Sequence, residues 1–178
     1  MNDELSWVRW WAHAWKEAHT DWLPQGLAAV KPESLLNLAQ ARHMNLAHAF
    51  AIEPCQPLKP HPAHLRFVLA DPYERQVILQ RVEAACRPQV QLQLSEDEGL
   101  WCCRIAKAMN TESWLAPTDD PLQLLRAWVP AQCWQRLRVS FARERILELE
   151  QARPLLLSPA KLDALWQAVI WRTLSSRI

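Results

Sequence analysis

The stretch SWVRWWAHAWKEAHTDWLP, residues 6–24, decides the fold of this chain, because it carries five tryptophans at helical spacing. At about 100° per residue, four of the rings fall within one arc of a helix, namely Trp7, Trp10, Trp11 and Trp15. Charged and histidine side chains occupy the opposite side. We therefore predict an amphipathic helix over about residues 4–19, with its rings packed against other helices. Pro24 cannot continue this helix.

The composition also indicates helices. The chain has 178 residues, of which 50% are hydrophobic and 22% are charged, so it is long and apolar enough to fold as one domain over residues 1–178. It contains only 2 glycines but 13 prolines. Few glycines disfavour tight hairpins and phosphate-binding loops, whereas prolines suit the first position of a helix. We predict a mainly all-α fold with a tryptophan-rich core.

Periodicity and capping residues place the other helices. They are predicted at about 32–50, 72–86 and 96–109, from Asp120 and Pro121 onward, as one long or two broken helices within 130–152, and from Ser158 and Pro159 onward. In the last of these, the predicted buried face comprises Leu162, Leu165, Trp166, Val169 and Ile170. The run LRFVLADP, residues 65–72, is consistent with either a short strand or a helical turn.

Two segments depart from this helical pattern. Alternating residues in QVQLQL predict one short β element at about 89–94. Four prolines lie between Pro54 and Pro62, so residues 53–63 are predicted to form an internal linker.

The charge and the hydropathy of the chain argue against nucleic acid and the membrane interior as binding partners. The net charge is +1 and the pI is about 7.7, which gives no basic field for nucleic acid. No apolar run approaches the roughly 18 residues that span a bilayer, so we expect no membrane insertion. The first residues, MNDEL, are acidic where a secretory signal is basic. We therefore expect a cytoplasmic protein.

The cysteines and histidines indicate no metal site. The five cysteines have no Cys-x-x-Cys spacing, and reduced thiols used as small apolar residues account for them: Cys55, Cys86, Cys102, Cys103 and Cys133. The histidines form two close pairs, His43 with His48 and His61 with His64. Neither pair has the further ligands that zinc requires. We expect no metal and no cofactor.

No catalytic constellation is evident either. The clustered acids lie where helices should begin and there complement the helix dipole: Glu96, Asp97, Glu98, Asp119 and Asp120. Cys102 and Cys103 fall within a predicted helix, which is a poor place for a reactive thiolate. No nucleophile elbow or nucleotide fingerprint occurs. We therefore expect no enzymatic activity and no small-molecule substrate, with a small enzyme kept as a third class of function.

Arginines and tryptophans raise the question of binding surfaces. The arginines of QRLRVSFARER do not share one helical face and alternate with acids, which predicts a solvated, salt-bridged surface: Arg136, Arg138, Arg143 and Arg145. The chain has 11 tryptophans, most of which we expect in the core. Tryptophan is also frequent at protein–protein hot spots, so one or two exposed rings would serve an interface.

Several segments together resemble a known family. DWLPQGL, residues 21–27, precedes the leucine-rich PESLLNLAQ; LADPYERQVILQRVEAACRP has an Asp-Pro helix entry; and LLLSPAKLDALWQAVIWR begins its helix at Ser-Pro. Together they resemble the K subunit of bacterial type III secretion systems, the accessory protein of the cytoplasmic sorting platform. The residues matched by motif are Trp22, Leu23 and Pro24, whose role would be architectural.

The resemblance implies a helical, non-enzymatic adaptor without a cofactor. Such proteins bridge the cytoplasmic domain of the inner-membrane ring protein and the pod protein, so they work in the cytoplasm, peripherally docked at the secretion apparatus. The alternative is a cytosolic helical chaperone or regulator that binds another protein. Co-purification with a ring or pod component would favour the adaptor, and release of an exported substrate would favour the chaperone.

Overall fold

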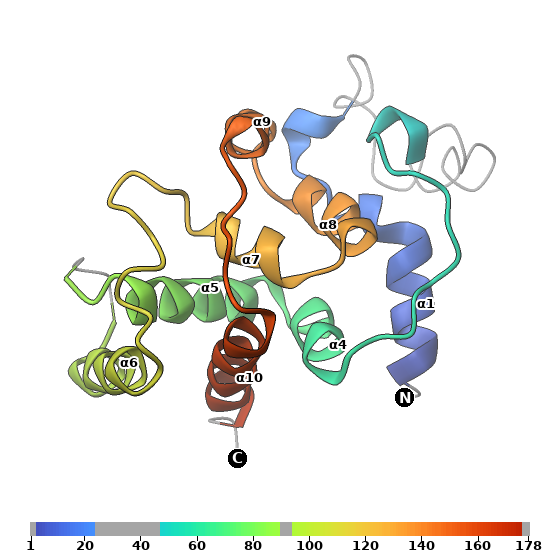
Figure 1. Ribbon diagram of the computed structural model, residues 1–178. Coiled ribbons are helices and arrows are strands. Elements are labelled where there is room, and N and C mark those ends of the chain that lie inside the picture. The colour runs from blue at the N-terminus through green and yellow to red at the C-terminus, as the bar shows by residue number, and fades with distance from the viewer. Residues whose placement is uncertain (1–2, 24–46, 90–93, 176–178) are drawn as a thin grey trace. The chain divides into compact units, whose positions relative to one another are not determined.

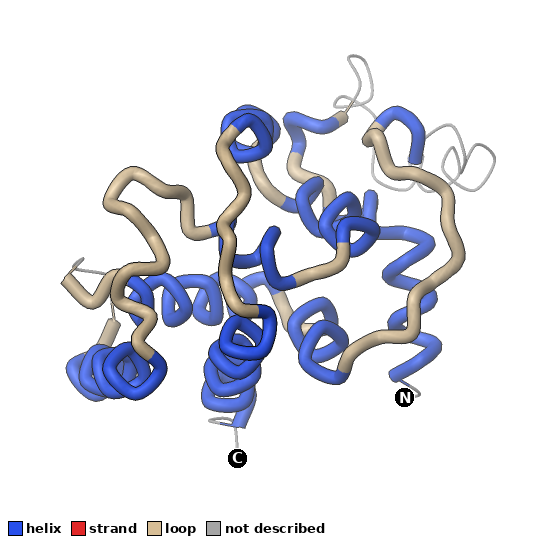
Figure 2. The backbone as a smooth tube through the Cα atoms, viewed as in Figure 1, coloured by secondary structure: helices blue, strands red, loops and turns tan. Residues whose placement is uncertain are grey.

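The computed structural model describes residues 3–23, 47–89 and 94–175, and within these ranges all regular structure is helical (Figure 2). This confirms the all-α prediction. The predicted β element at 89–94 and the predicted helix at 32–50 lie largely outside the described residues. No helix in the described part of the chain is both long enough and apolar enough to cross a membrane.

The chain divides into two compact units. The first comprises Met1–Lys59 and Pro130–Ala152, and the second comprises Pro60–Val129 and Arg153–Ile178. One of the boundaries between them, after Lys59, falls in the proline-rich segment. The single-domain organisation stays a prediction.

The tryptophan-rich stretch begins the first unit. Helix α1, Asp3–His13, buries Trp7, Trp10 and Trp11, as the spacing predicts. The predicted extent of 4–19 is wrong in part, because the α-helix ends at His13 and continues as the 3₁₀ helix η1, Ala14–Glu17. At His13 the backbone leaves the helical region, with φ −130° and ψ 27°. The chain then turns so that the His19 N–H donates to the Val139 carbonyl at 2.7 Å.

The later part of the first unit is broken rather than continuous. It forms α8, Ala131–Leu137, the 3₁₀ helix η3, Arg138–Ser140, and α9, Arg143–Gln151. The break falls at Phe141, whose backbone is extended. Of the two predicted arrangements, the broken one is therefore confirmed.

The proline-rich segment is bound to the helices of the first unit through its carbonyl groups. The indole N–H of Trp7 donates to the Leu58 carbonyl at 2.8 Å, and that of Trp11 donates to the Cys55 carbonyl at 3.0 Å. These carbonyls are available because the segment is neither helix nor strand, so its main-chain groups must find partners elsewhere. The tryptophans of α1 therefore bury their rings and also fix the path of an extended segment that has no helical hydrogen bonds of its own.

The second unit contains five helices among its described residues: α4, Pro62–Leu69; α5, Pro72–Cys86; α6, Glu96–Met109; α7, Leu122–Trp128; and α10, Pro159–Ser175. Helix α10 packs against each of the other four, and α5 lies beside α6 (Figure 1). The run LRFVLADP, left open between strand and helix, contributes to α4.

Local caps account for the bounds of α5 and α6. Asp71 accepts from the Glu74 N–H at 2.8 Å while the Glu74 carboxylate accepts from the Asp71 N–H, and Ser95 and Glu98 repeat this box at the start of α6. The Glu98 carboxylate also pairs with Arg81 of α5. Because Arg81 in turn donates to the Thr173 hydroxyl of α10 at 2.8 Å, one guanidinium joins three helices.

Candidate protein-binding site

One tryptophan differs from the other ten. Seven tryptophans are buried and three are half-buried, whereas Trp171 is 62% exposed. The buried face of α10 consists of the five residues that the periodicity predicts, ending at Ile170. Trp171 follows Ile170 by about 100° around the helix and so leaves that face. A large, exposed aromatic ring on a packed helix is a candidate contact for another protein.

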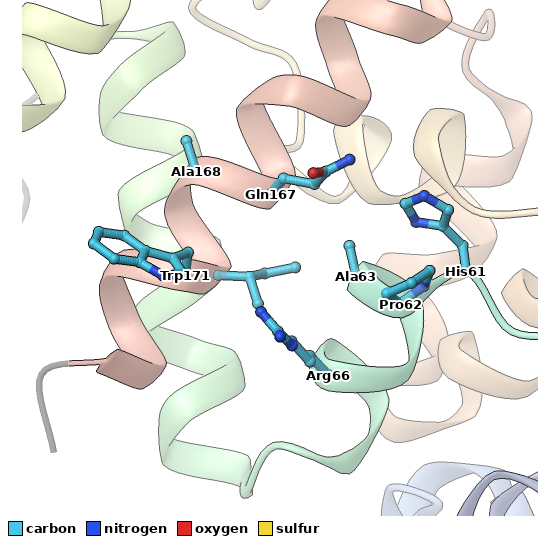
Figure 3. A pocket seen from close by; sticks show the side chains of 8 residues that line it. His61, Pro62, Ala63, Arg66, Gln167, Ala168 and Trp171 are labelled. Carbon is cyan, nitrogen blue, oxygen red and sulfur yellow. The ribbon is translucent and has the colours of Figure 1, made fainter. Parts of the chain in front are cut away.

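Trp171 borders a groove between α4 and α10 (Figure 3). The groove has a volume of about 490 Å³. Its lining residues come from both helices and from the residue before α4: His61, Pro62, Ala63, Arg66, Gln167, Ala168, Ile170 and Trp171. Ala63 and Ile170 are buried, while Arg66 and Gln167 are exposed. The groove therefore combines an apolar base with polar and aromatic side chains that solvent can reach.

The side chains that line the groove include cationic but not acidic groups, while the Asp163 carboxylate lies just outside the lining, 3.8 Å from His61. The lining contains the permanent positive charge of Arg66 and the titratable His61, and it contains no aspartate or glutamate. Among the residues that the structure describes, the Arg66 guanidinium forms no ion pair. The groove is thus suited to a negatively charged group.

Asp163 organises the side chains next to the groove. Its carboxylate accepts from the Trp128 indole N–H at 3.0 Å and from the Gln167 amide at 2.6 Å, and it lies 3.8 Å from Nδ1 of His61. Burial opposes the charge, but these hydrogen bonds and the nearby histidines outweigh it and hold the pKa of the Asp163 carboxyl below its usual range. The ionised Asp163 carboxylate therefore holds the Gln167 side chain in position through this hydrogen bond.

Aromatic rings support the groove from within the second unit. Trp128 and Trp166 are stacked, with ring centroids 4.5 Å apart and an interplanar angle of 2°, and Phe67 meets Trp166 edge-on at 5.5 Å. His64 packs against Trp128 at 4.4 Å. Burial and the neighbouring His61 lower the pKa of His64 from 6.5 to about 4, so its ring is neutral at pH 7. These contacts hold α4, α7 and α10 together, and so support the two helices that line the groove.

The motif residues Trp22 and Leu23 lie elsewhere, in the first unit. Trp22 ends the 3₁₀ helix η2, Thr20–Trp22, and is buried; its indole N–H donates to the Phe141 carbonyl at 2.8 Å. This contact joins the N-terminal part of the unit to the break before α9. Pro24 lies outside the described residues.

The predicted arginine surface requires a correction. Arg136 is buried rather than solvated, and its side chain donates to the carbonyls of Trp11, Gln132 and Glu53. Its guanidinium carbon lies 4.0 Å from the centre of the Trp11 ring. Arg138 does form a salt bridge, to Glu150 at 2.8 Å. The buried position of Arg136 follows from its place on α8, one turn after the buried Cys133.

The other candidate residues lie apart from the groove. Asp119 and Asp120 accept from main-chain N–H groups at 2.7 and 2.8 Å near the start of α7, and the acids of α6 lie in its first turn. Burial raises the pKa of the Cys102 thiol to about 11, against a reactive thiolate there. Within the described residues, no three His, Cys, Asp or Glu side chains are grouped so as to hold a metal ion. His43 lies outside those residues.

Comparison of the chain with known protein families, with curated proteins and with solved structures finds no significant match. The sorting-platform role that the sequence resemblance implies is therefore a proposal.

Proposed function

We propose that this chain is a non-enzymatic helical adaptor that binds other proteins. The observation that carries this proposal is Trp171, 62% exposed beside a groove that also presents Arg66. Burial of an aromatic ring of this size in an interface stabilises the complex, whereas an exposed ring adds little to the stability of the isolated chain. Tryptophan and arginine are, with tyrosine, the side chains that most often dominate the binding energy of interfaces, and here both lie at one groove.

We propose further that the adaptor works in the cytoplasmic sorting platform of a type III secretion system, peripherally docked at the inner membrane. Its partners there would be the cytoplasmic domain of the inner-membrane ring protein and the pod protein. The support is the resemblance of three sequence segments. Two of them contain helix starts, at Pro72 of α5 and Pro159 of α10, and one contains the buried Trp22, the last residue of η2.

The direct test is recovery of the tagged full chain from cells that express the whole secretion gene cluster. We expect a ring or pod component at a near-stoichiometric ratio, and less of it with Trp171→Ala. Tyr73→Ala is the matched control, because Tyr73 is a second exposed aromatic residue, on α5 and outside the groove lining. Recovery of an exported substrate instead, released on secretion, would replace the adaptor with the chaperone alternative. Absence of every ring and pod component would refute the sorting-platform role.

A further inference from the structure

We propose that the groove between α4 and α10 binds a segment of a partner protein that presents a carboxylate beside a large apolar side chain. This inference rests on the proposed protein-binding role and specifies the chemistry of the partner. Arg66 would receive the carboxylate, and Trp171 together with the base of the groove would cover the apolar side chain.

The charge argument begins with Arg66. Its guanidinium is exposed and has no ion-pair partner among the described residues, and no acid lines the groove. The ionised Asp163 beside the groove lies 3.8 Å from Nδ1 of His61 and forms no ion pair with Arg66. An incoming carboxylate therefore meets a cation that no acid in the lining neutralises. The planar guanidinium can bind a carboxylate through two parallel hydrogen bonds.

The apolar argument concerns Ile170 and Trp171. Ile170 is 1% exposed at the base of the groove, whereas most of the Trp171 side chain faces solvent. A small ligand seated at the base would leave much of this ring uncovered. A polypeptide segment can fill the groove and lie across the ring at the same time. We therefore favour a protein segment over a small molecule as the occupant.

The support beneath the groove favours binding to a preformed surface. The Trp128–Trp166 stack and the hydrogen bonds of Asp163 hold α10 and Gln167 in place. Binding to side chains that are already ordered costs less conformational entropy than binding that must order them. A short segment with one charged and one apolar anchor is then sufficient for specific recognition.

The test uses the full chain in cells that carry the secretion gene cluster. A photo-reactive phenylalanine analogue replaces Ala168, which lines the groove, and the control chain carries it in place of Tyr73. We expect cross-links from position 168 to one protein, at a segment that contains Asp or Glu next to a large apolar residue. Mass spectrometry of the cross-linked peptide identifies that segment.

Two variants then test the assigned roles in the cross-linking chain. Arg66→Glu and Trp171→Ala should each lower the yield of this cross-link by on the order of tenfold or more, as loss of a hot-spot residue does. Arg104→Glu makes the same charge change at an exposed position of α6 and should leave the yield unchanged. Reversing the partner's acid to Arg should restore the cross-link to the Arg66→Glu chain but not to the Trp171→Ala chain. Thermal unfolding of each variant verifies that it is folded.

Four results would overturn the inference: no cross-link from position 168, a cross-linked segment without a carboxylate, cross-links only to a second copy of this chain, or a yield insensitive to Arg66→Glu. The sorting-platform proposal fails separately. If the cross-linked and charge-rescued partner is neither a ring nor a pod protein, the groove inference holds and the sorting-platform role does not. If ring or pod proteins co-purify with the chain but no cross-link forms from position 168, the sorting-platform role stands and the groove inference fails.

Discussion

Replacement of Trp11 by alanine should cost more stability than the same replacement of Trp10, its neighbour in α1. Trp11 is 4% exposed and packs against Trp7 at 5.6 Å and Trp10 at 6.2 Å. Its indole N–H donates to the Cys55 carbonyl, and Arg136 lies over its ring. The change therefore removes core volume, a tertiary hydrogen bond and a cation–π contact together.

The magnitude follows from these contacts. Truncation of a buried tryptophan to alanine costs about 3–5 kcal/mol. The lost hydrogen bond adds about 1 kcal/mol and the desolvated cation–π contact up to about 2 kcal/mol, although neighbouring contributions are not fully additive. We expect a loss of about 5 kcal/mol for Trp11→Ala. Trp10→Ala should cost about 3 kcal/mol, since the Trp10 ring is slightly more exposed and has no comparable stack with a guanidinium.

Urea unfolding followed by far-UV circular dichroism measures these differences. A loss of about 5 kcal/mol approaches the whole stability of many domains, so the Trp11→Ala chain can be unfolded without urea. Trp11→Phe retains most of the apolar ring but removes the N–H, and it should remain folded with a loss of about 1–2 kcal/mol. Losses below about 1 kcal/mol for both alanine variants would refute the burial of these rings.

Four further predictions concern polar and titratable groups. Arg136→Met should lower the free energy of unfolding by about 2–4 kcal/mol in the same urea assay, because main-chain carbonyls lose their charged donor; an unchanged midpoint would contradict the buried position of this residue. Since burial and His61 lower the pKa of His64 from 6.5 to about 4, the unfolded chain binds the proton more readily. Stability should therefore fall as the pH drops from 6.5 toward 4, and His64→Gln should flatten that fall. Below pH 4.5 a second loss of stability is expected as Glu98, whose pKa is lowered mainly by its hydrogen bond from Arg81, becomes protonated. In Glu98→Gln this loss should be smaller, and the part that remains includes the contribution of Asp163, whose pKa is also lowered. With a thiol reagent at pH 8, exposed Cys55 should react first, and three buried thiols with raised pKa values should react only after unfolding, namely Cys86, Cys102 and Cys133.

The elements that the sequence predicts best are those with local start and stop signals. The predicted ranges 72–86 and 96–109 coincide with α5 and α6, because each begins with a capping box that its own residues complete. The end of α1 at His13 has no such signal. The path that the chain takes after it includes the hydrogen bond from His19 to Val139, which comes from a distant part of the chain and is not visible in a local window.

The candidate site was only partly predictable for the same reason. The predicted apolar face of α10 omits Trp171, and this omission was a usable sign that the ring is exposed. The position of Arg66 in the groove lining was not predicted, because the groove exists only once α4 and α10 are packed together. The burial of Arg136 was also missed, since a pattern of alternating charges does not reveal that main-chain carbonyls of Trp11 and Glu53 converge on one guanidinium.

Isothermal titration of the purified chain with the purified cytoplasmic domain of the ring protein, and separately with the pod protein, tests the adaptor function most directly. The wild-type chain should bind at least one of them with a defined stoichiometry, and Trp171→Ala should weaken that binding by about tenfold or more without changing the thermal stability of the chain. Heats indistinguishable from dilution with both proteins, or equal affinities for the wild-type and Trp171→Ala chains, would contradict the account.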